Sequence, residues 1–133
     1  MRKVDREAYI NSKREIDIHK ELSHPNIIRL YEIIEDEDDK VYMIMEFAEE
    51  GELCPYDTEI KQFCPEGVRD RFLDEKKVLS YSQQLLSALA YLHSKNFMHC
   101  DLKPQNVLIS KGLVKLADFG SAQMFYGEDD TLL

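Results

Sequence analysis

The stretch His-Cys-Asp-Leu-Lys-Pro-Gln-Asn at positions 99–106, followed by Asp-Phe-Gly at positions 118–120, carries more information than the rest of the chain. It sets an acid, an amine and an amide at fixed offsets, then a second acid beyond a short predicted hairpin. A site that moves a phosphoryl group between oxygens needs this set of groups. The four side chains concerned are Asp101, Lys103, Asn106 and Asp118.

Each of the four has a role that its chemistry permits. Asp101 can accept a proton from a hydroxyl and orient its oxygen. Lys103 can neutralise charge on the phosphate in transfer. Asn106 and Asp118 offer oxygen atoms to Mg²⁺, a hard cation. We therefore take Asp101 and Lys103 as candidate catalytic residues, and Asn106 and Asp118 as candidate metal ligands.

Length and composition limit the classes of protein to consider. A chain of 133 residues fits one ordinary domain or part of a larger one. The net charge of −9 argues against nucleic acid and against an anionic membrane as partners, because both bind clustered Lys and Arg. No apolar run approaches the roughly 20 residues that span a bilayer, and the charged N-terminus lacks the apolar core of a signal peptide. We expect an intracellular protein, cytoplasmic or nuclear, with reduced cysteines.

Hydrophobic periodicity predicts the order of the elements. Residues 6–22 favour a helix that Pro25 ends, and residues 27–35 and 41–47 read as an antiparallel hairpin. Residues 49–53 break the strand pattern, and residues 54–76 predict an irregular connection with a short helical piece. The strongest helix is expected over residues 78–94, with Ser80 and Ser82 near its start. A second hairpin, residues 106–109 and 113–117, turns at residues 110–112.

Motifs and element order together resemble the middle of a eukaryotic protein kinase domain, and Leu-Lys-Pro-x-Asn after Asp101 resembles the Ser/Thr-specific type. The resemblance implies an α+β, bilobal kinase-like fold that is incomplete here, a partial kinase domain over residues 1–133. Residues 1–45 would be the end of the small lobe, residues 46–53 a hinge, and residues 54–133 the start of the large lobe up to the Asp-Phe-Gly segment. It also implies ATP and Mg²⁺ as cofactors and a protein substrate.

The resemblance assigns roles to further residues. Glu15, ten residues before Pro25, matches the helix glutamate that pairs with an ATP-orienting lysine; otherwise it is a surface charge. The other candidate nucleotide-binding residues are a gatekeeper, two hinge positions, a ribose or substrate contact and the apolar floor under adenine: Met45, Glu46, Ala48, Glu52 and Leu108.

Two histidines are expected beside the Phe of the Asp-Phe-Gly motif. His99 matches the catalytic-loop histidine that packs on Phe119. His19 falls where the family usually has an apolar residue contacting the same Phe119. His24 and His93 have no metal-ligand spacing, so capping or packing roles suffice for them.

Within the family, three segments are similar to the calcium/calmodulin-dependent kinase kinases, which phosphorylate other kinases. They are residues 39–47, the connection with its cysteines and prolines, and Gly-Glu-Asp-Asp at 127–130. The substrate would then be another kinase.

Three departures from the family pattern stand out. Cys100 replaces the usual arginine, which predicts weaker dependence on activation-loop phosphorylation. No glycine-rich loop and no strand lysine for Glu15 occur in the sequence, and the segment after Asp-Phe-Gly stops before Ala-Pro-Glu. We therefore interpret the chain as a fragment and expect low stability in isolation.

Three functional hypotheses follow. The first is ATP-dependent phosphoryl transfer to Ser/Thr hydroxyls of proteins. The second is a catalytically inactive, pseudokinase-like binding or scaffolding module, because the lysine and glycine loop are missing. The third is a small acidic interaction protein unrelated to kinases, which the ordered set of motifs argues against.

Overall fold

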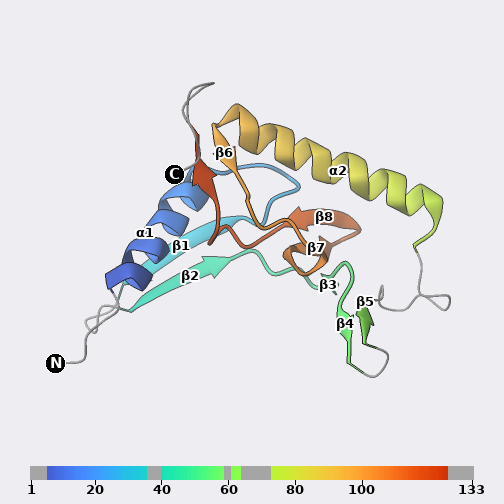
Figure 1. Cartoon of the computed structure of the whole chain (residues 1–133), viewed down its shortest axis with the longest axis horizontal. Helices are drawn as coiled ribbons and strands as arrows, with labels where there is room; N and C mark the ends of the chain where they lie inside the picture. Colours follow the sequence, from blue (N-terminus) through green and yellow to red (C-terminus); the bar gives the residue numbers. More distant parts are fainter. Residues whose placement is uncertain (1–5, 36–39, 59–60, 64–72, 126–133) are drawn as a thin grey trace.

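The computed structural model describes residues 6–35, 40–58, 61–63 and 73–125, and only the backbone of residues 6–12. The described residues form two α-helices and several short strands, the mixed α+β class that the sequence predicts (Figure 1). The elements are α1 (Arg6–Lys20), β1 (Leu30–Glu35), β2 (Val41–Met45), β3 (Gly51–Glu52), β4 (Tyr56–Asp57), β5 (Gln62–Phe63), α2 (Glu75–Ser94), β6 (Phe97–Met98), the 3-10 turn η1 (Pro104–Asn106), β7 (Val107–Ser110), β8 (Leu113–Leu116) and β9 (Gln123–Met124).

The first helix and hairpin form as expected, with one correction. β1 and β2 pair antiparallel, with Ile33 opposite Met43. The predicted strand over residues 27–35 begins three residues too early, because Ile27 and Ile28 join β8 instead. Ile27 bridges Leu116, and the Ile28 N–H donates to the Leu116 carbonyl at 2.9 Å. The loop after α1 is thereby attached to the strand that leads to Asp-Phe-Gly.

The long helix α2 starts earlier than the sequence pattern indicated. Asp74 is its N-cap, and the carboxylate accepts from the N–H groups of Lys76 and Lys77 at 2.9 and 3.1 Å. This cap satisfies two of the backbone N–H donors that the start of a helix leaves without partners. The helix therefore begins at Glu75, and Ser80 and Ser82 lie inside it. Asn96, with φ 60°, follows the last turn in the left-handed conformation common after helices.

A three-stranded sheet in the order β3-β7-β8 connects residues 99–106 to the Asp-Phe-Gly segment (Figure 1). β7 and β8 are joined at Lys111 and Gly112, both with positive φ (51° and 71°), the conformation of a tight hairpin turn. β3 was not expected, because two residues give no alternation to detect. The β4–β5 hairpin also replaces part of the predicted irregular connection, and no described residue between Cys54 and Asp74 is helical.

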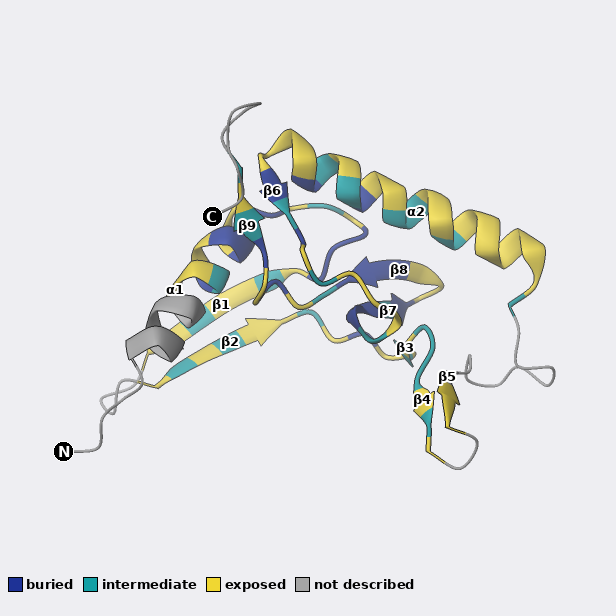
Figure 2. Ribbon diagram, in the orientation of Figure 1, coloured by how far each residue is buried: buried dark blue, intermediate teal, exposed yellow. Residues whose placement is uncertain are grey.

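Buried side chains gather where α1, α2 and β6–β8 meet (Figure 2). The main core contains Ile18, Leu22, Ile27, Ala88, Leu92, Phe97, Leu116, Phe119 and Ala122. A second cluster, Val107, Ile109 and Val114, packs on α2 through Tyr81 and Leu85. By contrast, β1 and β2 are mostly exposed or half-buried. Neither described helix is long and apolar enough to cross a membrane.

Candidate active site

The candidate catalytic loop, residues 99–106, holds Asp101 between a cation and an amide. The Lys103 ammonium lies 2.8 Å from Asp101 Oδ2, and the Asn106 amide donates to the same oxygen at 3.0 Å. The lysine contact above all, then Asn106, lowers the pKa of Asp101. The same pair raises the pKa of Lys103. Both side chains are therefore charged at neutral pH, and Asp101 is ready to accept a hydrogen bond from a hydroxyl.

The backbone before Asp101 adopts an unusual conformation. Cys100 has φ 62°, a region that residues with a side chain rarely occupy. The next N–H, that of Asp101, donates to His99 Nδ1 at 3.3 Å. Such conformations often occur at functional sites, where the surrounding contacts hold them.

His99 and Ala117 connect this loop to the Asp-Phe-Gly motif. His99 Nε2 donates to the Ala117 carbonyl at 2.9 Å, and the Ala117 N–H donates to the Asn106 carbonyl at the same distance. With Nδ1 accepting from Asp101, this network requires the neutral tautomer protonated at Nε2. Both backbone groups of the residue before Asp118 are thus fixed to the catalytic loop.

Asp118 completes the cluster. It has φ 62°, and its Oδ1 accepts from the Gly120 N–H at 3.2 Å. Its charge also contributes to raising the pKa of Lys103, so the two charges lie near enough to interact. The structure therefore brings together all four residues that the sequence singled out.

The oxygens in this cluster suit Mg²⁺. The Asn106 amide nitrogen donates to the Asp101 carbonyl at 2.8 Å as well as to its carboxylate, which leaves Asn106 Oδ1 for another partner. Asp118 supplies a carboxylate. The described residues contain no group of three His, Cys, Asp or Glu side chains that could hold a metal. A divalent cation here would take few protein oxygens and complete its shell with phosphate and water, as Mg²⁺ commonly does.

Glu15 points from α1 toward the same place. A Cβ added to Gly120 would lie 3.6 Å from Glu15 Oε2 and 3.3 Å from Asp118 Oδ1. Burial, and then the charge of Asp118, raise the pKa of Glu15. Among the described residues, no Lys or Arg forms an ion pair with Glu15. Within the described ranges, the Glu15 carboxylate therefore lies beside a second acid, Asp118.

The two histidines expected beside Phe119 are both there. Their ring centroids lie 4.9 Å (His19) and 5.1 Å (His99) from that of Phe119, which is 1% exposed. His24 packs on Tyr91 and accepts from the Asn26 N–H, and His93 meets Phe125 edge-on.

The predicted hinge residues follow β2. Met45 is 41% exposed at the end of this strand, and Ala48 is buried. The Glu46 N–H donates to the Arg29 carbonyl at 2.8 Å, so only the carbonyl of Glu46 could accept from a ligand. Glu52 on β3 lies directly opposite Leu108 on β7, so their side chains emerge on the same face of the sheet.

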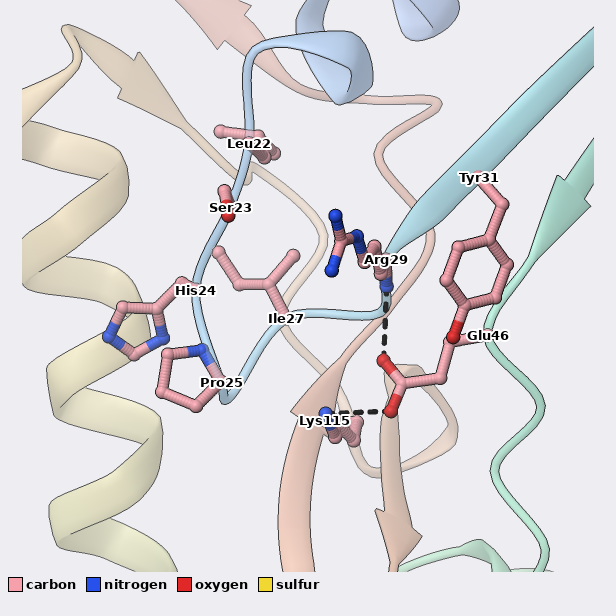
Figure 3. A pocket seen from close by; sticks show the side chains of 9 residues that line it. All are labelled: Leu22, Ser23, His24, Pro25, Ile27, Arg29, Tyr31, Glu46 and Lys115. Carbon is pink, nitrogen blue, oxygen red and sulfur yellow. Dashed lines mark hydrogen bonds and ion pairs between the residues drawn. The ribbon is translucent and has the colours of Figure 1, made fainter.

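The side chain of Glu46 has a separate position that the sequence did not suggest. It lines a cavity of about 300 Å³ between the loop after α1 and β8 (Figure 3). One carboxylate oxygen lies 2.7 Å from Lys115 Nζ, and the other accepts from the Arg29 N–H at 3.2 Å. The sequence offers one signal for this ion pair: Lys115 stands between the apolar residues Val114 and Leu116. A lysine buried in such a strand needs a charged partner.

Comparison with known proteins places the chain in a family. Residues 1–131 match the protein kinase domain, so the chain belongs to the protein kinase family. It is 40% identical over 119 residues to a calcium/calmodulin-dependent protein kinase kinase of Caenorhabditis elegans, a match covering 88% of this chain and 20% of that protein. It is also 40% identical over 124 residues to the probable serine/threonine-protein kinase MARK-A of Dictyostelium discoideum, covering 92% and 11%.

These matches confirm the resemblance to Ser/Thr protein kinases. The chain spans only 20% and 11% of these two relatives. Of the residues that suggested the kinase kinase subgroup, Asp39, residues 59–60 and 64–72 of the connection, and residues 127–130 lie outside the described part of the structure.

Proposed function

We propose that the protein containing this chain transfers the γ-phosphoryl group of ATP to Ser or Thr hydroxyls of protein substrates. The observation that carries the proposal is the cluster of Asp101, Lys103 and Asn106, fixed through Ala117 to Asp118. Its two acids, amine and amide are the groups that this reaction needs. Family membership supports the same reaction.

Each residue of the cluster has a proposed part. Asp101 accepts the hydrogen bond of the substrate hydroxyl and takes its proton as the new bond forms. Lys103 stabilises negative charge on the group in transfer. Asn106 Oδ1 and the Asp118 carboxylate would hold Mg²⁺, which, when bound, neutralises phosphate charge.

The nucleotide base would lie against the hinge. We propose the Glu46 carbonyl and the backbone of Ala48 as partners for adenine, with Met45 as gatekeeper. Leu108 would be the apolar floor and Glu52, on the same face of the β3–β7 pair, the ribose or substrate contact. Glu15 would orient the ATP-binding lysine, and its raised pKa fits a carboxylate whose cation lies elsewhere.

The substrate we propose is a protein, another kinase among the candidates. The similarity to the nematode calcium/calmodulin-dependent protein kinase kinase supports this class. The alternative is a catalytically inactive, pseudokinase-like binding or scaffolding module. One observation favours it: Glu15 has no ion-pair partner among the described residues.

A measurement of phosphoryl-transfer turnover distinguishes the active kinase from the pseudokinase-like module. In the intact protein, Asp101→Asn and Asp118→Ala should each lower kcat by on the order of 10²–10⁴-fold, because each removes a group that acts in the transition state. Glu32→Gln, an exposed acid on β1, is the matched control and should leave the rate unchanged. Phosphate transfer to protein that is undiminished in both site variants would refute the proposal, and binding of Mg²⁺-ATP without turnover would favour the pseudokinase.

A further inference from the structure

The two histidines on Phe119 differ in how their ring nitrogens are satisfied. His99 uses both, donating to the Ala117 carbonyl and accepting from the Asp101 N–H. His19 uses one: its Nε2 lies 2.7 Å from the Ile28 carbonyl. Its Nδ1 is fully buried and has no hydrogen-bond partner. A neutral ring tolerates this, but a proton on Nδ1 would be a buried donor without an acceptor.

We propose that His19 is a proton-sensitive positioning residue, whose protonation releases α1 from Phe119 and thereby moves Glu15 away from Asp118. α1 meets the Asp-Phe-Gly segment where the His19 ring packs on Phe119, in the core cluster that also holds Ile18. Glu15 stands one helical turn before His19, near Gly120 and Asp118. When His19 leaves the ring of Phe119, Glu15 moves with the same helix.

The charged and polar groups around His19 have opposite effects on its protonation. Glu15 on its own helix and Asp118 beside Phe119 are acids that favour a positive imidazole, and the face of the Phe119 ring attracts a cation. The His99 ring packs edge-on against the same phenylalanine. On the other side lies the Ile28 carbonyl, followed by Arg29, whose guanidinium is over Tyr31. Burial outweighs the carbonyl contact and lowers the pKa of His19.

The sign of the pH effect follows. In the released state His19 is in water and has the ordinary histidine pKa of about 6.5. Above that pH neither state binds the proton, and the packed arrangement keeps its full stability. As the pH falls below about 6.5, the released state takes up the proton first, so the equilibrium shifts toward it. At pH 5.5 the shift can reach about 10-fold.

The first test is amide hydrogen exchange of the intact protein, in α1 and at Gly120, corrected for the intrinsic pH dependence of exchange. From pH 7.5 to 5.5 the opening constant should rise by about 10-fold in the wild type. It should change less than about 2-fold in His19→Leu, which has no ionisable side chain at this position. His93→Gln, an exposed histidine of α2, is the control and should behave as the wild type. Equal pH dependence in the wild type and His19→Leu would overturn the proposal.

Two further measurements keep the proposal open to refutation. NMR titration of the His19 ring needs no variant, and a pKa at or above the ordinary value would overturn it. Should His19→Leu fail to fold, His19→Met takes its place, because methionine adapts to the same space. The loss of kcat/KM between pH 7.5 and 5.5 should be smaller in either apolar variant than in the wild type.

The effect on activity rests on the proposed phosphoryl transfer, whereas the release of α1 does not. Absence of turnover at both pH values would refute the proposed function and the regulation of it. The exchange and NMR results would still decide whether His19 controls the packing of α1.

Discussion

Among the residues that the structure describes, two lysine–carboxylate pairs have nearly equal N–O distances but different surroundings. Lys103 and Asp101 are 2.8 Å apart with side chains 45% and 33% exposed. Lys115 and Glu46 are 2.7 Å apart with side chains 11% and 18% exposed. Water screens the first pair and leaves it accessible to a substrate, whereas the second is largely removed from water. The same contact is therefore open to a ligand in one place and enclosed by the packing of the chain in the other.

The two pairs also connect different parts of the chain. Lys103 and Asp101 are neighbours in one loop, so their contact closes only a local turn. Lys115 lies on β8, and Glu46 directly follows β2. The second pair thus ties the predicted hinge to the strand that leads to Asp118, while the Glu46 carboxylate also holds the Arg29 N–H (Figure 3).

The largest expected effect concerns the exposed pair. Lys103→Met in the intact protein should lower kcat by on the order of 10²–10³-fold, because the cation that stabilises the transferred phosphate is lost. The melting temperature should stay unchanged, since the pair is screened by water. Lys111→Met, at the exposed turn of β7–β8, is the control for both measurements. A large loss of thermal stability in Lys103→Met would contradict the division of roles between the pairs.

The buried pair should give the opposite result. Lys115→Met leaves the Glu46 carboxylate without its cation, which should cost about 2–3 kcal/mol of unfolding free energy, less than for a fully buried pair because both side chains retain some exposure. Urea titration measures this. The double variant Lys115→Met/Glu46→Gln removes the charge but keeps an acceptor for the Arg29 N–H. We expect it to recover at least half of the loss, and simple additivity of the two single changes would argue that the pair is not coupled.

The sequence predicted the parts of this molecule that depend on local patterns. The β7–β8 hairpin, the long helix α2 and the cluster of four side chains follow from periodicity and spacing within about 20 residues, so their positions could be read directly. Family membership bears out the kinase-like fold. The functional roles of the four residues remain predictions, as do the boundaries proposed for the lobes and hinge.

The features that the sequence did not reveal are long-range. β3 has two residues and exists because Gly51 and Glu52 pair with β7 more than fifty positions away. The Glu46–Lys115 pair joins positions separated by 69 residues, which no local pattern encodes. Ile27 was assigned to a strand for its β-branched side chain, and its tertiary contact with Leu116 decided otherwise.

A smaller expected effect concerns a buried and an exposed hydrogen bond between uncharged side chains, and it tests whether burial matters for them as well. The buried Asn26 amide donates to Gln84 Oε1 at 2.9 Å and to the Val114 carbonyl at 3.0 Å, joining the loop after α1 to α2 and β8. Gln84 also contacts Ser80, but at 3.3 Å and in water. Asn26→Ala should lower the unfolding free energy by about 1–2 kcal/mol, because the Val114 carbonyl loses its side-chain donor in a dry place.

Ser80→Ala is the matched control, since it removes an exposed partner of the same glutamine. It should change the unfolding free energy by no more than about 0.5 kcal/mol, because water replaces the lost hydroxyl. Both variants are compared by urea titration at one pH. Similar losses in the two would mean that burial does not set the strength of these contacts, and the contrast between the two lysine pairs would then need another cause. A large loss confined to Asn26→Ala would extend the same rule from ion pairs to neutral hydrogen bonds.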